Sequence, residues 1–249
     1  MSLFVVSDVH GYVDDLRNGL AGAGLIGDDD TWTGEDHQLW VLGDLLDRGP
    51  DGIGSIDLVR SLQQQAPDNV HMLMGNHEAL ALGYKQFPET RFGELWALNG
   101  GLESDQKGLS EDHLAWMRSL PVLARAGDFL LMHSDATDYL EWGSSVEEVN
   151  ESVTSLLADD TDDAAALWGV FASLTNRFDF AGQDGSRVAQ DMLRMLGGST
   201  IVHGHSIIGS LVGKPSEEVE GPISYADGLV IAIDGGRYDG GPLLVVELG

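Results

Sequence analysis

The chain has 249 residues, 43% of them hydrophobic, and its formal net charge at pH 7 is −28. It contains no cysteine, which excludes disulfides, thiolate catalysis and cysteine–zinc sites. The large negative charge disfavours nucleic acids and anionic membranes as partners, because both carry charge of the same sign.

The hydrophobic content is sufficient for a sizeable core, and the sequence shows no internal repeat or linker. A single domain over residues 1–249 is therefore expected. No apolar run is long enough to span a bilayer. The N-terminal segment has no basic flank and leads directly into a strand that carries chemistry-bearing residues, so we expect no cleaved signal peptide. These features predict a cytoplasmic protein.

The first predicted element is an apolar strand at residues 4–6, which runs into Asp8 and His10. In an extended segment, side chains two residues apart point to the same side, so both residues can reach one metal ion. Residues 13–23 have the apolar spacing of a helix, and residues 27–37 form a polar, acidic loop.

A second strand is expected at residues 38–42, and it ends just before Asp44. Asp47 and Arg48 follow on the same turn. Residues 51–65 then predict a helix with an apolar face. The second strand is therefore followed by two carboxylates, just as the first is followed by Asp8.

A third strand, at residues 70–74, leads to Asn76 and His77 at the start of another helix. Such strand-to-helix turns commonly hold the chemistry of α/β proteins. The series of strands and helices up to this point predicts a mostly parallel sheet.

The middle of the chain is harder to assign. Residues 84–108 look less regular, with aromatic residues and several glycines. A short helix is expected at residues 114–120. Residues 121–125 and 128–132 predict a hairpin, and its second strand ends at His133.

Residues 135–165 are strongly acidic, with an apolar face at helical spacing over residues 146–157. We favour a solvated amphipathic helix here. A lid that controls substrate access is the alternative, because the segment directly follows His133. Residues 168–174 are apolar and lead to Arg177.

The last third contains a helix at residues 188–196 and then a strand that ends in His203 and His205. Two late strands are expected at residues 229–233 and 243–248. Five predicted strands thus end in residue types that bind metals. Parallel or mixed sheets bring such ends to one edge.

The motifs Asp-x-His-Gly, Gly-Asp-x-x-Asp-Arg-Gly, Gly-Asn-His-Glu, a lone histidine after a strand, and Gly-His-Ser occur here in that order. Together they resemble the calcineurin-like metallophosphoesterases, in the phosphoprotein phosphatase branch found in bacteria. The resemblance runs from about residue 3 to the C-terminus, with weaker echoes at residues 96–101 and 233–243. It implies an α/β fold in which two mixed β-sheets pack face to face as a sandwich, flanked by helices.

The resemblance also implies two divalent metal ions. The first would be held by Asp8, His10 and Asp44, and the second by Asp44, Asn76, His133 and His205. Alone, each of these residues has an ordinary explanation, such as a helix cap or a surface histidine. Mixed oxygen and imidazole donors suit manganese, iron or zinc, and we expect manganese first.

By the same resemblance, a metal-bound hydroxide attacks the phosphate directly, and His77 protonates the leaving group. Asp47 would orient His77, and Arg48 would bind the phosphate. Arg177 is either a second phosphate ligand or an ordinary surface arginine. His203 is expected to be a core residue rather than a ligand.

The expected activity is hydrolysis of phosphate monoesters, with a phosphorylated protein or a small phosphate ester as substrate. A dinucleoside polyphosphate hydrolase is the alternative with the same fold, although only 13 residues are Lys or Arg. A catalytically silent scaffold and a phosphodiesterase are further alternatives. The intact ligand set disfavours the scaffold, and Ile207 disfavours the diesterase, which often carries Gly-His-x-His. The sequence makes no prediction of the oligomeric state.

Overall fold

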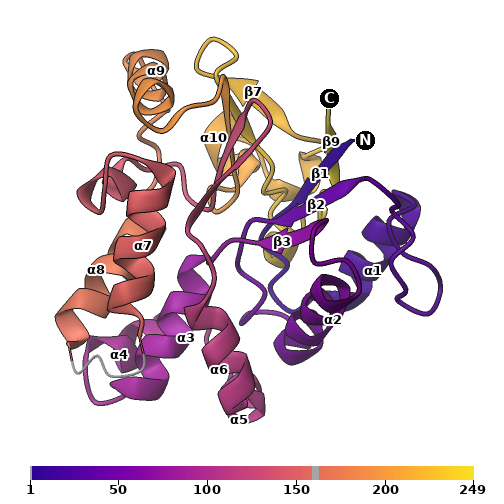
Figure 1. Cartoon of the computed structure of the whole chain (residues 1–249), viewed down its shortest axis with the longest axis vertical. Coiled ribbons are helices and arrows are strands. Elements are labelled where there is room, and N and C mark those ends of the chain that lie inside the picture. Colours follow the sequence, from indigo (N-terminus) through magenta and orange to yellow (C-terminus); the bar gives the residue numbers. More distant parts are fainter. Residues whose placement is uncertain (1, 159–162) are drawn as a thin grey trace.

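The computed structural model describes residues 2–158 and 163–249, and it shows two β-sheets surrounded by helices (Figure 1). The strands are β1 (Leu3–Val6), β2 (Gln38–Val41), β3 (Val70–Met72), β4 (Leu123–Ala126), β5 (Phe129–Met132), β6 (Thr200–His203), β7 (Ile223–Tyr225), β8 (Val230–Ala232) and β9 (Val246–Leu248). The helices are α1 (Val13–Gly22), α2 (Gly52–Gln65), α3 (Asn76–Gln86), α4 (Arg91–Leu98), α5 (Glu103–Gly108), α6 (Glu111–Arg118), α7 (Val146–Leu156), α8 (Ala164–Thr175), α9 (Gly185–Leu196) and α10 (Ile208–Val212). Single 3₁₀ turns occur at η1 (Asp138–Glu141), η2 (Ser216–Glu218) and η3 (Arg237–Asp239).

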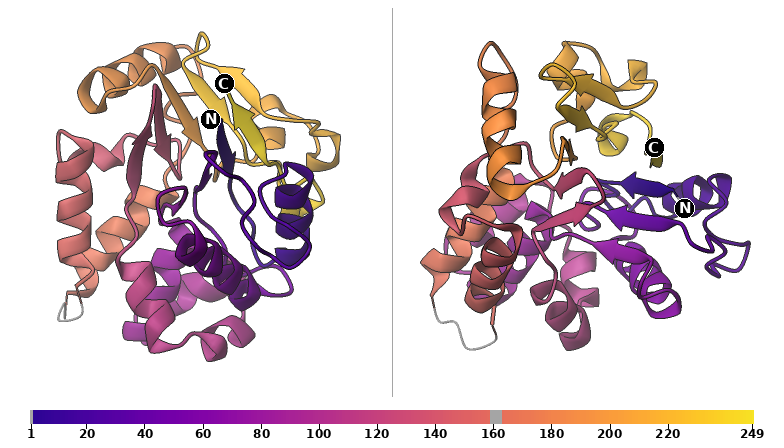
Figure 2. Two further views of the ribbon diagram at one scale, coloured as in Figure 1. Left: turned by 45° about the vertical axis from the view of Figure 1, so that its right-hand side comes forward. Right: turned by 45° about the horizontal axis from the view of Figure 1, so that its top comes forward.

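The first sheet has the strand order β3-β2-β1-β9, and the second has the order β4-β5-β6-β8-β7. β1, β2 and β3 run parallel, as predicted, whereas β9 lies antiparallel to β1. In the second sheet β5, β6 and β8 are parallel, and an antiparallel strand lies at each edge. Both sheets are therefore mixed. The pairing of β1 with β9 places the two ends of the chain close together (Figure 2).

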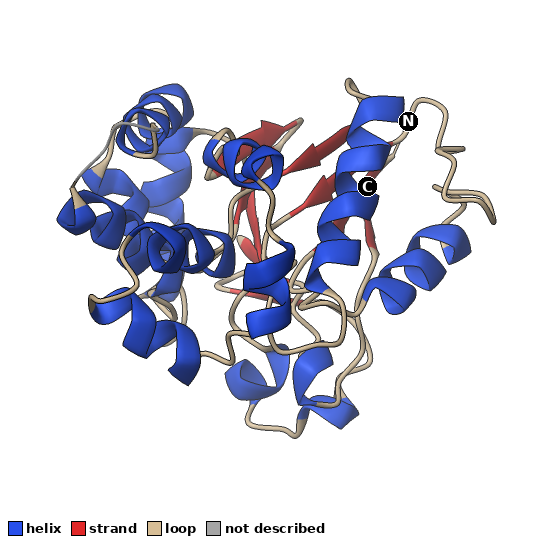
Figure 3. Cartoon of the chain, turned by 90° about the horizontal axis from the view of Figure 1, so that it is seen from below, coloured by secondary structure: helices blue, strands red, loops and turns tan. Residues whose placement is uncertain are grey.

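The two sheets pack face to face through one buried apolar cluster. Val5 of the first sheet belongs to it, together with Leu131 and Val202 of the second. Phe4 and Val6, the neighbours of Val5, point to the opposite face and pack in the cluster that contains apolar residues of α1 and α2. Figure 3 shows helices on the outside of the strands. The predicted sandwich with flanking helices is confirmed.

The structure corrects the prediction for residues 84–108, because this segment is helical rather than irregular. It holds the end of α3, all of α4 and all of α5. Phe92 and Trp96 are buried one helical turn apart on α4, and the Thr90 hydroxyl accepts the Phe92 N–H at the start of that helix. Glycines on both sides of these aromatic residues mask the helical period in the sequence.

The acidic segment 135–165 contains the predicted amphipathic helix, α7, which buries Val146, Val149 and Val153. Residues 159–162 of this segment lie outside the described residues, and its role as a lid stays a hypothesis. The short strand β7 and the helix α10 were not predicted. In the described parts of the chain, each helix is too short or too polar to cross a bilayer.

Candidate metal centre

The turns that follow β1, β2, β5 and β6 meet at one edge of the sandwich. The Asp8 N–H donates to Gly43 O at 3.1 Å, and the Gly204 N–H donates to His133 O at 2.9 Å. The two sheets are joined where the His205 N–H donates to Asp8 Oδ2 at 2.8 Å. The predicted convergence of strand ends is therefore observed.

Asp8 and His10 reach the centre by a route that the sequence did not predict. The backbone is not extended there, because their φ angles are +54° and +45°. The two side chains still converge, with Asp8 Oδ1 3.9 Å from His10 Nε2. A left-handed turn, rather than the alternation of a strand, places them together. This corrects the reason for the pairing but not the pairing itself.

Asp44 lies in the middle of the centre and is buried. Its Oδ1 accepts the His77 N–H at 2.9 Å and lies 3.5 Å from His133 Nε2. Its Oδ2 lies on the other side, 3.6 Å from His10 Nε2. The two carboxylate oxygens therefore face two different histidines.

Glu78 holds the turn that carries Asp44, a role that the sequence analysis missed. Its buried carboxylate accepts three backbone N–H groups, from Asp44 and Gly75 at 2.9 Å each and from Leu45 at 2.8 Å. The signal was present, because a Glu at the third position of a helix commonly accepts the N–H of the residue before the helix, as Glu78 does here with Gly75.

His133 and Asn76 form the next part of the centre. His133 Nδ1 lies 2.7 Å from Leu42 O, which can only accept a hydrogen bond, so the ring proton is on Nδ1 and Nε2 carries the lone pair. His133 Nε2 lies 3.0 Å from Asn76 Oδ1. Two acceptors therefore face each other in a buried position.

Within residues 2–158 and 163–249, acidic and histidine side chains form two groups, in each of which the possible ligand atoms lie within 4.8 Å of one another. The first group is His10, Asp44 and His77; the second is Asp8, Asp44, His133 and His205. Asp44 is common to both groups. The grouping differs in two respects from the sets that the resemblance implies, since Asp8 lies with His133 and His205, and His77 lies with His10.

His77 is paired with Asp47, as the sequence predicts for an oriented histidine. His77 Nδ1 lies 2.8 Å from Asp47 Oδ2. Its other nitrogen, Nε2, is buried and has no hydrogen-bond partner among the described residues. Burial raises the pKa of Asp47 to about 6, although the Leu102 N–H and Arg48 act in the opposite direction.

Arg48 is held beside this pair by the segment that looked like a weak echo in the sequence. Its Nε donates to Asn99 O at 3.2 Å, and its backbone N–H donates to Gly100 O at 3.0 Å. Its Nη1 lies 2.9 Å from His10 Nε2. Residues 96–101 thus form one wall of the centre.

Arg177 also reaches the centre, with Nη2 2.8 Å from His205 Nε2. The structure therefore brings Arg177 to the same edge as Arg48. His203 is buried but lies outside both groups. Its Nε2 is 2.8 Å from the Tyr225 hydroxyl, and its Nδ1 is 2.8 Å from Gly204 O.

A family model of calcineurin-like phosphoesterases matches residues 1–209. The chain belongs to the calcineurin-like phosphoesterases. The symmetrical bis(5'-nucleosyl)-tetraphosphatase of Pectobacterium atrosepticum is 28% identical over 167 residues, which cover 65% of this chain and 52% of that protein. The chain spans about half the length of the curated relatives it matches.

Solved structures of the same fold include a cold-active protein-tyrosine phosphatase of a psychrophilic Shewanella species. It superimposes with a TM-score of 0.74 and 22% identity, over 99% of this chain and 75% of that one. A protein serine/threonine phosphatase from Saccharomyces cerevisiae superimposes with a TM-score of 0.62 and 18% identity, over 94% of this chain and 67% of that one. This likeness supports the fold that the resemblance implied.

The residues of the centre fit divalent metal ions of the kind that this family implies. Burial raises the pKa of Asp44 well above its ordinary value, and repulsion from Asp8 and Glu78 raises it further. Burial lowers the pKa values of His10 and His205 well below the ordinary range, so both rings are neutral. A bound cation would accept the lone pairs of the neutral imidazoles and relieve the repulsion between the crowded carboxylates.

Asp234, which the sequence analysis did not single out, adds to this concentration of acceptors. It is buried, its Oδ1 accepts the Gly236 N–H at 2.8 Å, and its Oδ2 has no partner within the described ranges. Burial and then repulsion from Asp8 raise its pKa well above the ordinary value. Asp234 Oδ2 is therefore a buried acceptor that a nearby cation would balance.

Proposed function

We propose that the chain is a dimetal-dependent phosphomonoesterase that resembles bacterial serine/threonine protein phosphatases. Its substrate would be a phosphorylated protein or a small phosphate ester. The observation that most supports this proposal is the position of Asp44, whose carboxylate oxygens face His133 on one side and His10 on the other. A carboxylate between two sets of ligands suits a pair of metal ions.

In this proposal Asp44 would be a ligand of both ions. His10 would hold the first ion with it, and the second would be held by three further residues, which are Asn76, His133 and His205. Asp8 lies close enough to both groups to serve either ion. Two divalent ions bound there supply Lewis-acid activation of the ester and of the attacking water. The mixed oxygen and imidazole donors suit manganese, iron or zinc, and we expect manganese first.

The remaining residues act on the phosphate and the leaving group. His77 presents its unpartnered Nε2 to the centre, and Asp47 fixes its ring and would stabilise the imidazolium. Burial lowers the pKa of His77 well below its ordinary value, so a dianionic phosphate beside Nε2 is needed to favour the protonated ring. Arg48 and Arg177 would bind the phosphate oxygens from two sides.

The second candidate is hydrolysis of a dinucleoside polyphosphate. The curated relatives favour it, because their names describe symmetrical bis(5'-nucleosyl)-tetraphosphatases. Such a substrate carries several phosphates and needs basic contacts along its length. Arg48 and Arg177 are the two phosphate ligands of this proposal, and such a small number of basic contacts favours the shorter monoester.

The test compares two substrates with purified, manganese-loaded protein. Phosphate release is measured from a pool of phosphoserine and phosphothreonine peptides, and nucleotide products are measured from diadenosine tetraphosphate. Protein stripped with EDTA and the variant Asp44→Asn are the controls, and both should lack metal and activity. Release from the peptides supports the proposal, whereas turnover of the dinucleotide alone moves the function to the second candidate. Full activity of Asp44→Asn would contradict the bridging role.

A further inference from the structure

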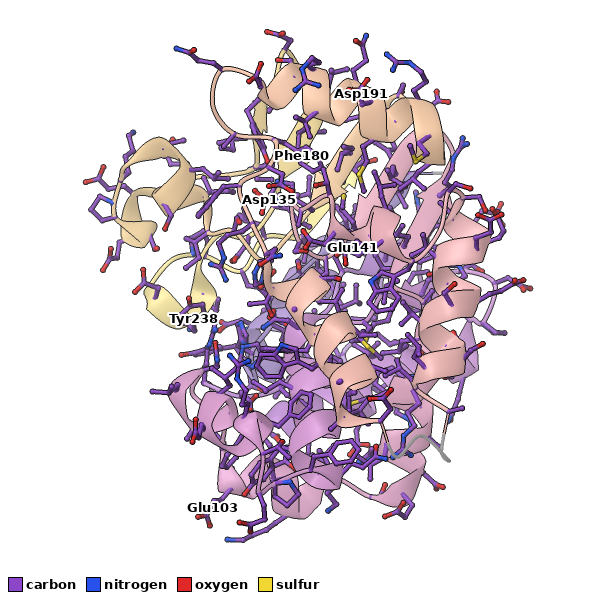
Figure 4. The ribbon with its side chains drawn as sticks, turned by 90° about the vertical axis from the view of Figure 1, so that its left-hand side faces the viewer. Glu103, Asp135, Glu141, Phe180, Asp191 and Tyr238 are labelled. Carbon is purple, nitrogen blue, oxygen red and sulfur yellow. The ribbon has the colours of Figure 1, made fainter. Side chains whose placement is uncertain are left out.

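A loop near the C-terminal end of the chain brings Tyr238 against Arg48, far away in the sequence. The Arg48 Cζ lies 3.9 Å from the centroid of the Tyr238 ring, which is the geometry of a cation–π contact. The same ring meets His10 edge to face, with the centroids 5.1 Å apart. Tyr238 is 36% exposed, so it lies at the outer margin of the centre. Figure 4 shows Tyr238 on the C-terminal ribbon, beside the N-terminal part of the chain.

The loop that carries Tyr238 is anchored on both sides of this residue. Arg237 donates through Nε to Asp15 on α1 at 2.6 Å, and its Cζ lies 4.2 Å from the centroid of the Tyr12 ring. On the other side, the Ser216 hydroxyl donates to Asp239 Oδ2 at 2.7 Å. The backbone of Tyr238 is therefore anchored on both sides by contacts that do not involve Arg48.

The contacts of Arg48 act in different directions. Its hydrogen bond to Asn99 O lies along an N–H bond, in the plane of the guanidinium. The Arg48 Cζ lies over the ring of Tyr238, so the ring packs against the same guanidinium. A guanidinium binds phosphate through parallel N–H bonds in one plane, so the orientation of that plane decides whether two bonds form at once.

We propose that Tyr238 is a positioning residue that holds the guanidinium of Arg48 in the plane that binds the substrate phosphate. This inference rests on the proposed function of Arg48. Without the ring, the guanidinium gains conformational freedom that phosphate binding must then remove. Loss of Tyr238 should consequently weaken phosphate affinity, with little effect on the subsequent chemistry.

The experiment uses the manganese-loaded chain with Tyr238→Leu, Tyr238→Phe, Arg48→Ala and the double variant Arg48→Ala/Tyr238→Leu. KM and kcat are measured with p-nitrophenyl phosphate, and the Kd of inorganic phosphate is measured by calorimetry. Tyr238→Leu should raise KM and the phosphate Kd by about 5- to 30-fold, the range that a cation–π contact of about 1–2 kcal/mol allows, with kcat nearly constant. Tyr238→Phe, which keeps the ring, should restore both values.

The double variant separates positioning from a general structural effect. In the Arg48→Ala background, Tyr238→Leu should not weaken phosphate binding further, because the partner of the ring is gone. An unchanged phosphate Kd in Tyr238→Leu, beside a weakened one in Arg48→Ala, would overturn the proposal. If Tyr238→Leu does not fold, Tyr238→Met takes its place. If the wild-type chain hydrolyses no ester, the proposed function fails, and the phosphate calorimetry still decides the role of Tyr238.

Discussion

Several residues of the centre have a backbone conformation that L-amino acids rarely adopt. Asp8, Asp44, Asp47, Arg48 and His205 have φ angles of +54°, +59°, +67°, +67° and +61°. Each such residue costs roughly 1–2 kcal/mol relative to the right-handed region. Such conformations occur where tight turns direct several polar side chains to one point. Strain of this kind clusters at functional sites, and here it coincides with the proposed ligands.

At the same scale, the role of His77 can be tested by His77→Asn. The variant should lower turnover by roughly 10²- to 10⁴-fold, the usual contribution of a positioned acid, and should keep its metal. Turnover and metal content are measured on the same samples, the latter by plasma emission spectroscopy.

His71→Asn is a suitable control, because His71 stacks on Trp40 and belongs to neither ligand group. It should keep its turnover. If the metal content of His77→Asn falls together with its activity, His77 is a ligand, as its place in a group with His10 and Asp44 would also allow.

At the scale of elements, the centre is built from turns that are hydrogen-bonded to one another. The start of α3 makes several of these hydrogen bonds. Glu78, in the first turn of α3, accepts N–H groups from the turn after β2 and from its own helix cap. The same helix supplies Asn76 and His77. Gly43 and Gly75 allow the close approach, because a Cβ on Gly43 would lie only 2.5 Å from Gly75 N. One helix terminus therefore positions the proposed bridging ligand, Asp44, a proposed terminal ligand, Asn76, and the proposed acid, His77.

Glu78→Gln should destabilise the fold even though the side chain keeps its size. The amide has one acceptor oxygen in place of two, so at least one of the three buried N–H donors loses its partner. The free energy of unfolding should fall by about 1–3 kcal/mol. Urea denaturation of the EDTA-treated protein measures the change.

Glu151→Gln, on the exposed side of α7, is the matched control and should change stability by less than about 0.5 kcal/mol. An equal effect of the two substitutions would show that Glu78 acts only through its charge.

At the scale of the whole molecule, acidic residues greatly outnumber basic ones. The chain has 41 acidic and 13 basic residues, so its surface repels itself at low ionic strength. Glu103 and Asp191 illustrate the distribution, since Figure 4 shows them near opposite ends of the molecule, each at the surface. The arginines at the centre, together with metal ions, would make the site locally positive within this acidic surface.

Salt should therefore stabilise the protein. The Debye length falls from about 10 Å at 0.1 M to about 3 Å at 1 M salt, which screens repulsion between exposed carboxylates. The Tm, measured by calorimetry, should rise as KCl increases over that range.

A variant with three charge reversals, Asp36→Lys, Glu151→Lys and Glu220→Lys, provides the comparison, because all three side chains are exposed. It should be more stable than the wild type at low salt and should gain less from KCl. A Tm that does not change with salt in the wild type would contradict the repulsion.

Strand periodicity and turn residues are local properties of the chain, so the sequence alone predicts the proposed ligand types, their order and the strand ends on which they lie. The order of the motifs also predicted the family and the sandwich of two sheets. The three-dimensional structure was needed to show how the proposed ligands group around Asp44, that Glu78 and Asp234 lie beside them, and that Tyr238 contacts Arg48. These contacts join residues far apart in the chain, and they depend on left-handed turns and on burial, which no local pattern encodes. The helices between residues 84 and 108 were not predicted for a related reason, since glycines mask the apolar spacing of α4, and the residues that α5 buries, Asp105 and Gln106, are polar.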